Sequence, residues 1–219
     1  KGATNDEWGN VEYYKCKNNV EHLFEDAEGK KPTTLNDVKV GMFKTFRVNT
    51  NVKKTLTVDL EAAPDGVTGN ACAVLVCGEL EINANISAKM GSRITYEKDD
   101  DGKDKLDDDG NPIIKEAHYY AVGVWSSNGY HKQLCPAGVE VADLPDAKVV
   151  IKGGNIEQKL TDEEKALCDE DGGSELIYAD SGAKVYIEGG SFKSYDPAGT
   201  LNCQDRSGSQ IIVTGGRFY

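Results

Sequence analysis

The sequence lacks the residue patterns of the common metal and cofactor sites. Its six cysteines contain no Cys-x-x-Cys pair. They are Cys16, Cys72, Cys77, Cys135, Cys168 and Cys203. The three histidines, His22, His118 and His131, do not lie at zinc-ligand spacing. We therefore predict no metal and no cofactor. Because a chain of this length does not need disulfides, we expect mostly free thiols buried as small apolar groups.

Long apolar runs and an excess of positive charge are also missing. No stretch approaches the roughly 18 apolar residues of a membrane span, and no signal-peptide hydrophobic region is present. Acidic residues number 37 against 25 basic ones, which gives a formal net charge of -12. Such a chain repels phosphate backbones and anionic lipid, so we expect neither a nucleic-acid partner nor membrane insertion.

What the sequence does contain is a repeat of short apolar runs around a Gly pair. Three copies align without gaps, at Lys148–Ile156, Lys184–Phe192 and Gln210–Phe218, and they begin 36 and then 26 residues apart. Apolar residues alternate in each copy, as strands with one buried face require. The residues expected to point inward are Val149, Ile151, Ile156, Val185, Ile187, Phe192, Ile211, Val213 and Phe218.

Looser copies extend the pattern toward the N-terminus. Gly78–Ile86 keeps the alternation without the Gly pair, and Thr55–Leu60 is expected to form the coil before it, with Leu56 aligned to Leu80 at about 24 residues. Each coil also has an earlier apolar run. These runs are Ala73–Val76, Tyr120–Trp125, Leu176–Ala179 and Thr200–Cys203. Two or more strands per coil predict stacked parallel sheets, with the Gly pair supplying positive φ at a sharp corner.

Three segments depart from this repeat. Near the start, apolar residues at positions i, i+3, i+4 and i+7 predict a short N-terminal capping helix. These residues are Val20, Leu23, Phe24 and Ala27. Residues 94–120 are expected to form a protruding β-hairpin with an acidic tip, and residues 160–173 a second insertion with a capping-box-like Thr161-Asp-Glu-Glu start.

We accordingly expect residues 1–40 to form an N-terminal segment and residues 41–219 one parallel β-helix with those two insertions. The chain begins at Lys1 rather than Met, and it ends at Tyr219, directly after the last copy of the repeat. We therefore expect it to be a fragment truncated at both ends.

The late coils resemble a known family. The stretch Val185-Tyr-Ile-Glu-Gly-Gly-Ser-Phe-Lys-Ser-Tyr-Asp-Pro197 is similar to the Gly-Gly coil and aromatic-Asp-Pro turn of pectin-lyase-like parallel β-helix proteins. These proteins occur as fibres and adhesins of gut-bacterial phages and prophages. The resemblance covers roughly residues 18 to 219. It implies a right-handed parallel β-helix, a solenoid, that serves as a non-catalytic structural or adhesive module of a head or tail fibre.

The resemblance also implies partners and a location. It favours a homotrimer on the virion surface that contacts host-surface glycans or neighbouring virion subunits. Two alternatives remain open, a polysaccharide depolymerase (a glycosidase or lyase on the same fold) and an extracellular adhesin on a bacterial cell surface. Trp125 and Tyr130, beside the turn Ser126-Ser-Asn-Gly129, are the candidate glycan contacts. Packing of Trp125 in the core or at a corner is the alternative for that residue.

The sequence gives only weak evidence for catalytic groups. A glycosidase needs two carboxylates about 5 to 9.5 Å apart, and a lyase needs a base beside a stabilising cation. The late coils offer Asp180, Glu188, Asp196 and Asp205, with Arg206 and Arg217 as cations. We expect these carboxylates to be solvated and predict that the chain is not an enzyme.

The acidic run Asp99–Asp109 holds seven aspartates and one glycine. Oxygen ligands at such short spacing could bind Ca²⁺, but the EF-hand order is absent. We expect a solvated hairpin, with a Ca²⁺ site as the alternative.

Overall fold

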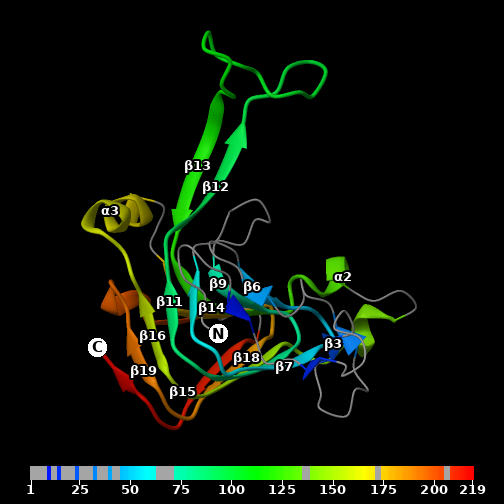
Figure 1. Ribbon diagram of the computed structural model, residues 1–219, viewed down its shortest axis with the longest axis vertical. Coiled ribbons are helices and arrows are strands. Elements are labelled where there is room, and N and C mark those ends of the chain that lie inside the picture. The colour runs from blue at the N-terminus through cyan, green and yellow to red at the C-terminus, as the bar shows by residue number, and fades with distance from the viewer. Residues whose placement is uncertain are drawn as a thin grey trace.

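The computed structural model describes residues 9–10, 14–15, 23–24, 32–33, 39–40, 45–62, 72–134, 139–170, 174–204 and 208–219. Within these residues the chain is mostly β-strand, gathered into three five-stranded parallel sheets and several smaller antiparallel ones (Figure 1). The all-β class predicted from the alternating apolar runs is confirmed.

The three parallel sheets are numbered here in the order in which the chain enters them. The first contains β6 (Phe46–Val48), β9 (Cys72–Val76), β14 (Val122–Ser127), β17 (Ile177–Asp180) and β20 (Leu201–Cys203). The second contains β7 (Lys53–Leu56), β10 (Glu79–Asn83), β15 (Lys148–Gly153), β18 (Lys184–Ile187) and β21 (Gln210–Val213). The third contains β8 (Leu60–Ala62), β11 (Ile86–Ala88), β16 (Asn155–Gln158), β19 (Ser191–Lys193) and β22 (Arg217–Phe218).

The chain passes through the first, second and third sheet in the same order five times. We call each set of three successive strands a rung, so that rung 1 is β6 to β8, rung 2 is β9 to β11, rung 3 is β14 to β16, rung 4 is β17 to β19 and rung 5 is β20 to β22. Every strand pairs in parallel with the equivalent strand of the next rung. The predicted earlier strand in each coil is confirmed as the first-sheet strand.

Apolar side chains from all three sheets meet in one core cluster, as the alternation requires. The inward residues predicted for rungs 3 and 4 are fully buried. In rung 5, Ile211 is partly buried against this cluster, whereas Val213 and Phe218 are 46% and 42% exposed. These two differ because, among the described residues, no strand pairs with the outer edge of rung 5.

The spacing of rungs 1 and 2 differs from the prediction. Leu56 pairs with Ile82 and Leu60 with Ile86, so these rungs are 26 residues apart and the alignment of Leu56 with Leu80 is wrong by two residues. Side chains on a strand repeat with period two. A shift of two therefore leaves Leu56 on the buried face, and the apolar pattern alone could not distinguish the two alignments.

The Gly pair at the corner between the second and third sheets has two separate roles. The second glycine has a positive φ in each copy, 97° at Gly154, 101° at Gly190 and 104° at Gly216, which confirms the predicted corner. At the first glycine the constraint is space. A Cβ on Gly189 would lie 2.4 Å from the carbonyl oxygen of Lys152, so only glycine lets neighbouring rungs approach this closely.

The predicted capping helix is wrong where the structure describes it. Leu23 and Phe24 form β3 (Leu23–Phe24), which pairs antiparallel with β2 (Tyr14–Lys15) and β4 (Pro32–Thr33). A second small sheet pairs β1 (Gly9–Asn10) with β5 (Lys39–Val40). Two adjacent apolar residues are compatible with a short strand as well as with a helix, so the spacing alone did not decide between them. Val20 and Ala27 lie outside the described residues.

Both predicted insertions leave the stack after strands of the third sheet. Between rungs 2 and 3, β12 (Gly91–Tyr96) and β13 (Ile114–Tyr120) pair antiparallel, and the hairpin stands away from the sheets (Figure 1). Between rungs 3 and 4, α3 (Asp162–Glu170) begins at the predicted capping box, where Thr161 Oγ1 accepts from Glu164 N at 3.2 Å. α3 contacts β13.

A buried glutamine joins the two points at which these insertions return to the stack. Gln158 Nε2 donates to the carbonyl oxygens of Ala121 and Ser174, both at 2.8 Å, and its Oε1 accepts from Ser194 Oγ at 2.8 Å. Ala121 follows the hairpin and Ser174 follows the α3 insertion. The hydrogen bonds satisfy backbone groups that strand pairing leaves free at this corner.

Candidate functional site

The outer face of the first sheet contains a hydrophobic cluster of its own. Cys72, Leu75, Cys77 and Val122 form a second hydrophobic cluster there, separate from the main core. Trp125, Tyr130 and Tyr178 are partly buried and pack against it. Trp125 is paired in register with Leu75 of β9 and with Tyr178 of β17, so the three side chains share one face. We call Trp125, Tyr130 and Tyr178 the aromatic cluster.

A tight turn after β14 places Tyr130 on this face. Gly129 N donates to Ser127 Oγ at 3.0 Å, and α2 (His131–Leu134) follows directly. His131 is buried and its Nε2 lies 3.0 Å from the carbonyl oxygen of Cys77. Because a carbonyl can only accept, Nε2 must carry the proton in this hydrogen bond. The bond holds the segment against the sheet.

The rings of the aromatic cluster meet at angles rather than face to face. The centroids of Trp125 and Tyr130 are 5.9 Å apart with an interplanar angle of 75°, and those of Trp125 and Tyr178 are 5.6 Å apart at 56°. Edge-to-face pairs of this kind are favoured by the ring quadrupoles. The structure thus brings together both predicted glycan contacts, and it places Trp125 in a packed environment, as the alternative interpretation expected.

Two enclosed polar atoms at this cluster have no hydrogen-bond partner among the described residues, Trp125 Nε1 and Asp180 Oδ1. Asp180 is opposite Ser127 in the register, one step along the outer face from the Trp125–Tyr178 pair. One atom is a donor and the other an acceptor. An enclosed polar atom left unpaired costs about 1 to 3 kcal/mol, so both atoms destabilise the fold unless a further group satisfies them.

Burial sets the charge state of the lining. It raises the pKa of Cys72 and raises the pKa of Cys77 to about 11, so both remain neutral thiols at physiological pH. Burial likewise raises the pKa of Tyr130 and of Tyr178, and the Asp180 carboxylate contributes to both shifts. Cys72 and Cys77 form no disulfide, as expected. Cys16 and Cys135 lie outside the described residues.

Sequence reasoning missed Tyr178 as a member of the site. Its signal was the alternation of β17, in which Ile177 and Ala179 enter the main core and therefore turn Tyr178 and Asp180 outward. Asp180 was considered only as one of several possible catalytic carboxylates. Its position beside Trp125 depends on pairing with a strand 53 residues away.

The other candidate carboxylates lie at the ends of different sheets. Glu188, after β18, pairs with Lys152 at 2.6 Å, and Asp196, after β19, accepts from Ala198 N at 2.9 Å as an N-cap. Asp180 ends β17 in the first sheet. Arg217 lies in β22, whose residues are exposed. Asp205 and Arg206 lie outside the described residues.

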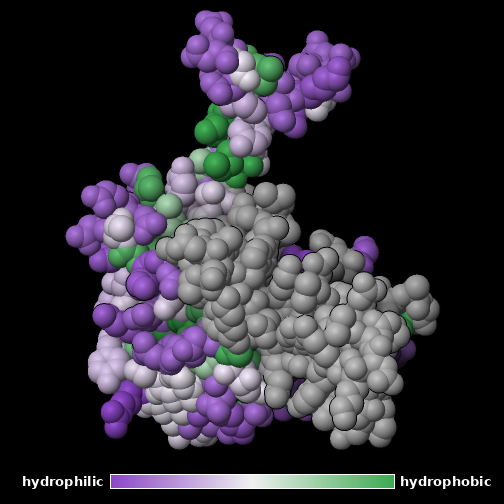
Figure 2. All heavy atoms as spheres, viewed as in Figure 1, coloured by the Kyte–Doolittle hydropathy of each residue, from purple (hydrophilic) through white to green (hydrophobic). Residues whose placement is uncertain are grey.

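The acidic hairpin tip consists of two similar turns. Asp99 Oδ1 accepts from Asp101 N at 3.0 Å and Lys103 N at 2.9 Å, and Asp107 Oδ1 accepts in the same way from Asp109 N and Asn111 N. Backbone bonds of 2.9 Å among residues 97, 105 and 113 join both turns to the hairpin stem. Figure 2 shows the two hydrophilic arms that result, on a stem with apolar residues. In the part of the chain that the structure describes, no group of three or more His, Cys, Asp or Glu is arranged to hold a metal ion.

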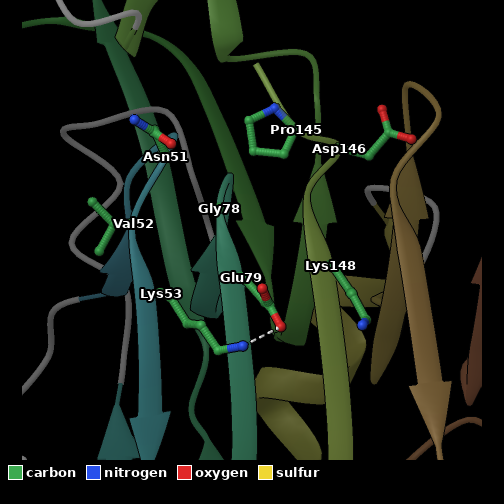
Figure 3. A pocket seen from close by; sticks show the side chains of 8 residues that line it. All are labelled: Asn51, Val52, Lys53, Gly78, Glu79, Pro145, Asp146 and Lys148. Carbon is green, nitrogen blue, oxygen red and sulfur yellow. Dashed lines mark hydrogen bonds and ion pairs between the residues drawn. The ribbon is translucent and has the colours of Figure 1, made fainter. Parts of the chain in front are cut away.

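A polar cleft of about 230 Å³ lies where the first sheet turns into the second (Figure 3). It is lined by Asn51, Val52, Lys53, Gly78, Glu79, Pro145, Asp146 and Lys148. The segment between β14 and β15 contributes Tyr130 to the aromatic cluster and Pro145 and Asp146 to the cleft. The two features are therefore positioned by the same long corner of rung 3.

No protein family, no curated protein and no solved structure matches the chain. Among the helices that the structure describes, none has the length and apolar character required to cross a membrane.

Proposed function

We propose that the three sheets close into a right-handed parallel β-helix of the pectin-lyase-like kind. Three features support this fold, namely the constant order of the sheets, the parallel pairing of every rung with the next, and the glycine corners. A stack of this kind buries one continuous core because each rung packs on its neighbours. It provides a rigid support for side chains on its outer faces.

We propose further that the chain is a non-catalytic adhesive module of a phage fibre or related appendage, and that the aromatic cluster binds a host-surface glycan. The proposal is supported by two enclosed atoms at this cluster that have no hydrogen-bond partner among the described residues, the donor Trp125 Nε1 and the acceptor Asp180 Oδ1. A sugar hydroxyl both donates and accepts, so one or two hydroxyls can satisfy both atoms. The aromatic rings supply apolar surface for the C–H face of the sugar.

We propose that a sugar enters this site past Tyr130. Tyr130 meets Trp125 edge-on, and its short segment is held to the sheet by the His131 hydrogen bond. The Tyr130 ring packs against the smaller cluster of the outer face rather than the main core, so its movement would admit a sugar without opening that core. In a homotrimer on the virion surface, three such sites would act together, and weak single contacts would gain by multivalency.

The test is to measure whether the chain binds polysaccharides and whether it cleaves them. The chain is titrated with polysaccharides from gut-bacterial cell surfaces, alongside two variants, Trp125→Phe, which removes the indole N–H donor, and Asp180→Ala, which removes the carboxylate acceptor. We expect each variant to bind about five- to tenfold more weakly, as the loss of one hydrogen bond predicts. Thr55→Ser, on the second sheet, is the control and should bind like the parent.

Two outcomes would overturn the proposal. Equal affinity of both variants for every polysaccharide that binds would exclude the aromatic cluster as the site. Release of reducing ends or of unsaturated uronate absorbance would instead favour a depolymerase.

A further inference from the structure

Among the described residues, one lysine at the cleft on the corner between the first and second sheets lies near carboxylates without forming an ion pair. Four charged residues form one row on the outer face of the second sheet, because each is paired with the next across adjacent strands. They are Lys53 on β7, Glu79 on β10, Lys148 on β15 and Lys184 on β18. Lys53 binds Glu79 at 2.9 Å, which lowers the pKa of that carboxyl, and the nearby Lys148 charge lowers it further (Figure 3). Among the described residues, Lys148 forms no ion pair.

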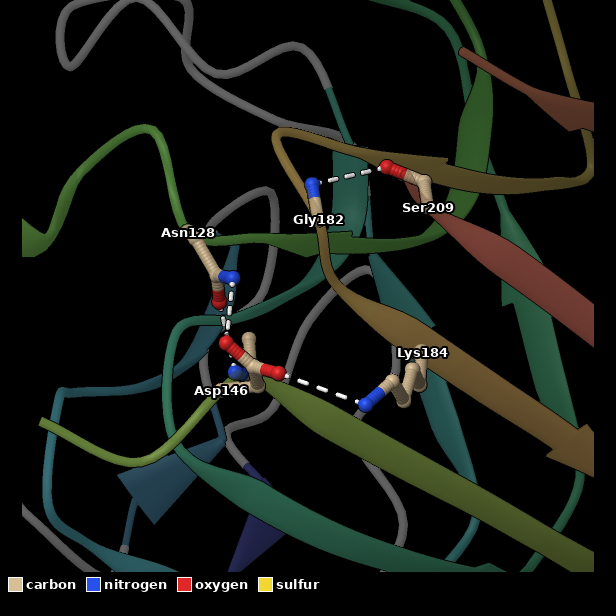
Figure 4. A network of polar contacts seen from close by, with 6 residues as sticks. Asn128, Asp146, Gly182, Lys184 and Ser209 are labelled. Atoms are coloured by element: carbon tan, nitrogen blue, oxygen red, sulfur yellow. Dashed lines mark hydrogen bonds and ion pairs between the residues drawn. The ribbon is translucent and has the colours of Figure 1, made fainter. Parts of the chain in front are cut away.

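The neighbouring acid on the other side of Lys148 is already engaged. Asp146 accepts from Asn128 Nδ2 at 3.0 Å and from Lys184 Nζ at 3.3 Å, and Asn128 Oδ1 also accepts from Ala147 N (Figure 4). At the adjacent corner, Gly182 N donates to Ser209 Oγ at 2.9 Å. Each flanking acid thus has an ion pair of its own, Glu79 with Lys53 and Asp146 with Lys184, whereas the Lys148 ammonium has none among the described residues.

An apolar strip lies beside this ammonium. Lys148 Nζ is 5.4 Å from the ring centroid of Tyr186, within the range of a cation–π contact. Val150, Tyr186 and Ile212 are paired across β15, β18 and β21 on the outer face, and all three are partly exposed. A cation next to an aromatic and aliphatic strip matches a ligand that has an apolar face and a negative group.

We propose that this cleft and strip bind a carboxylate-bearing sugar, with the carboxylate on Lys148 and the sugar face on Tyr186. Glu79 and Asp146 flank the lysine, so their repulsion favours a singly charged carboxylate over a doubly charged phosphate. The inference rests on the proposed glycan-binding function and assigns its ligand class, acidic glycans. It adds a second contact point around the corner from the aromatic cluster.

The experiment follows amide, indole and lysine resonances by NMR while D-glucuronate, and separately D-glucose, is added at millimolar concentration. We expect glucuronate to shift resonances of Val52, Gly78, Lys148 and Tyr186 saturably, and glucose to leave them unchanged. Lys148→Gln should weaken the glucuronate response about five- to tenfold, and Lys148→Arg should retain it. Lys152→Gln, on the same strand but paired with Glu188, is the matched control and should respond like the parent.

The outcomes separate the two proposals. Equal responses to glucuronate and glucose, or an undiminished response in Lys148→Gln, would overturn the acidic-sugar assignment. The Trp125 indole resonance reports on the aromatic cluster in the same spectra. If neutral host oligosaccharides shift the indole while glucuronate leaves the cleft unchanged, the inference fails and the proposed function stands. If glucuronate shifts the cleft and no glycan shifts the indole, the proposed aromatic site fails and the acidic-sugar site stands.

Discussion

At the scale of single residues, the second sheet contains a column of aliphatic side chains that runs through all five rungs. Leu56, Ile82, Ile151, Ile187 and Val213 are paired in register from β7 to β21. The first four are fully buried. Each contacts only the equivalent residues of adjacent rungs along the column, so an altered residue affects the rungs on both sides.

Ile187→Asp should lower the free energy of unfolding by several kcal/mol, or about 3 to 5, because it places an uncompensated carboxylate in a packed column. Thr55→Asp, at an exposed position on the same sheet, should change it by less than about 0.5 kcal/mol. Urea unfolding followed by circular dichroism gives both values. An unchanged midpoint for Ile187→Asp would mean that the register of the second sheet is wrong.

Tyr195 gives the chain an alkaline limit. Its hydroxyl is enclosed, and burial, together with the nearby Cys168 and Asp169, raises its pKa from 10.0 to about 12. Between these pH values the unfolded chain releases a proton that the folded chain keeps. The contribution of Tyr195 to the free energy of unfolding is therefore complete below pH 10 and is lost as the pH rises through about 12. Tyr195→Phe should flatten this slope in urea unfolding from pH 9 to 12. Identical slopes for both proteins would contradict the assignment.

At the scale of elements, the hairpin is built from local interactions at its tip and from distant ones at its base. The two Asp turns depend on hydrogen bonds that span at most four residues. The base depends on Gln158, which binds Ala121 across 37 residues. Tip and base should therefore contribute very differently to the stability of the stack.

Replacing residues 98–112 with Asn-Gly should leave the stack folded. Glu97 N donates to the Ile113 carbonyl oxygen at 2.9 Å, the pairing that a two-residue turn closes. The melting temperature should change by less than about 3 °C, since no core residue is removed. Gln158→Leu is the contrasting variant and should cost about 2 to 3 kcal/mol, because buried carbonyl groups lose their donor. Insoluble protein from the turn replacement would show that the tip is a structural element.

At the scale of the whole molecule, stability should be graded along the stack. Rungs 2 to 4 have neighbours on both sides, whereas rung 5 has a partner on one side only among the described residues. The Phe192 and Phe218 rings stack with centroids 4.9 Å apart, yet Phe218 remains 42% exposed. Elements with fewer buried contacts open at lower free energy.

Native-state hydrogen exchange should therefore be slowest in β10 and β15 and fastest, among the parallel strands, in β20 to β22. The last rung should exchange at least about tenfold faster than the centre, which corresponds to about 1.4 kcal/mol of local opening free energy. Mass spectrometry of proteolytic fragments resolves the rungs separately. Uniform exchange in all five rungs would show that the stack opens only as a single unit.

The sequence predicted the features that depend on near neighbours. Alternation identified the inward residues of rungs 3 and 4, because the faces of a strand follow from its period alone. The Gly pairs indicated the sharp corner because only glycine takes positive φ without strain. The capping box at Thr161 and the hairpin turns are equally local. Leu23 and Phe24 show the limit of this reasoning, since two apolar residues fit a helix and a strand alike.

The sequence by itself therefore determined the strands, their buried faces and the sharp corners, through interactions within a few residues. Only the tertiary structure decided which outward side chains meet. Trp125 lies beside Tyr178 because β14 pairs with β17, and the cleft forms because Gly78 and Pro145, far apart in the chain, border the same corner. Side chains on an outer face leave no apolar period of their own. The aromatic cluster and Lys148 acquire their chemistry from the register of the rungs, which long-range pairing fixes.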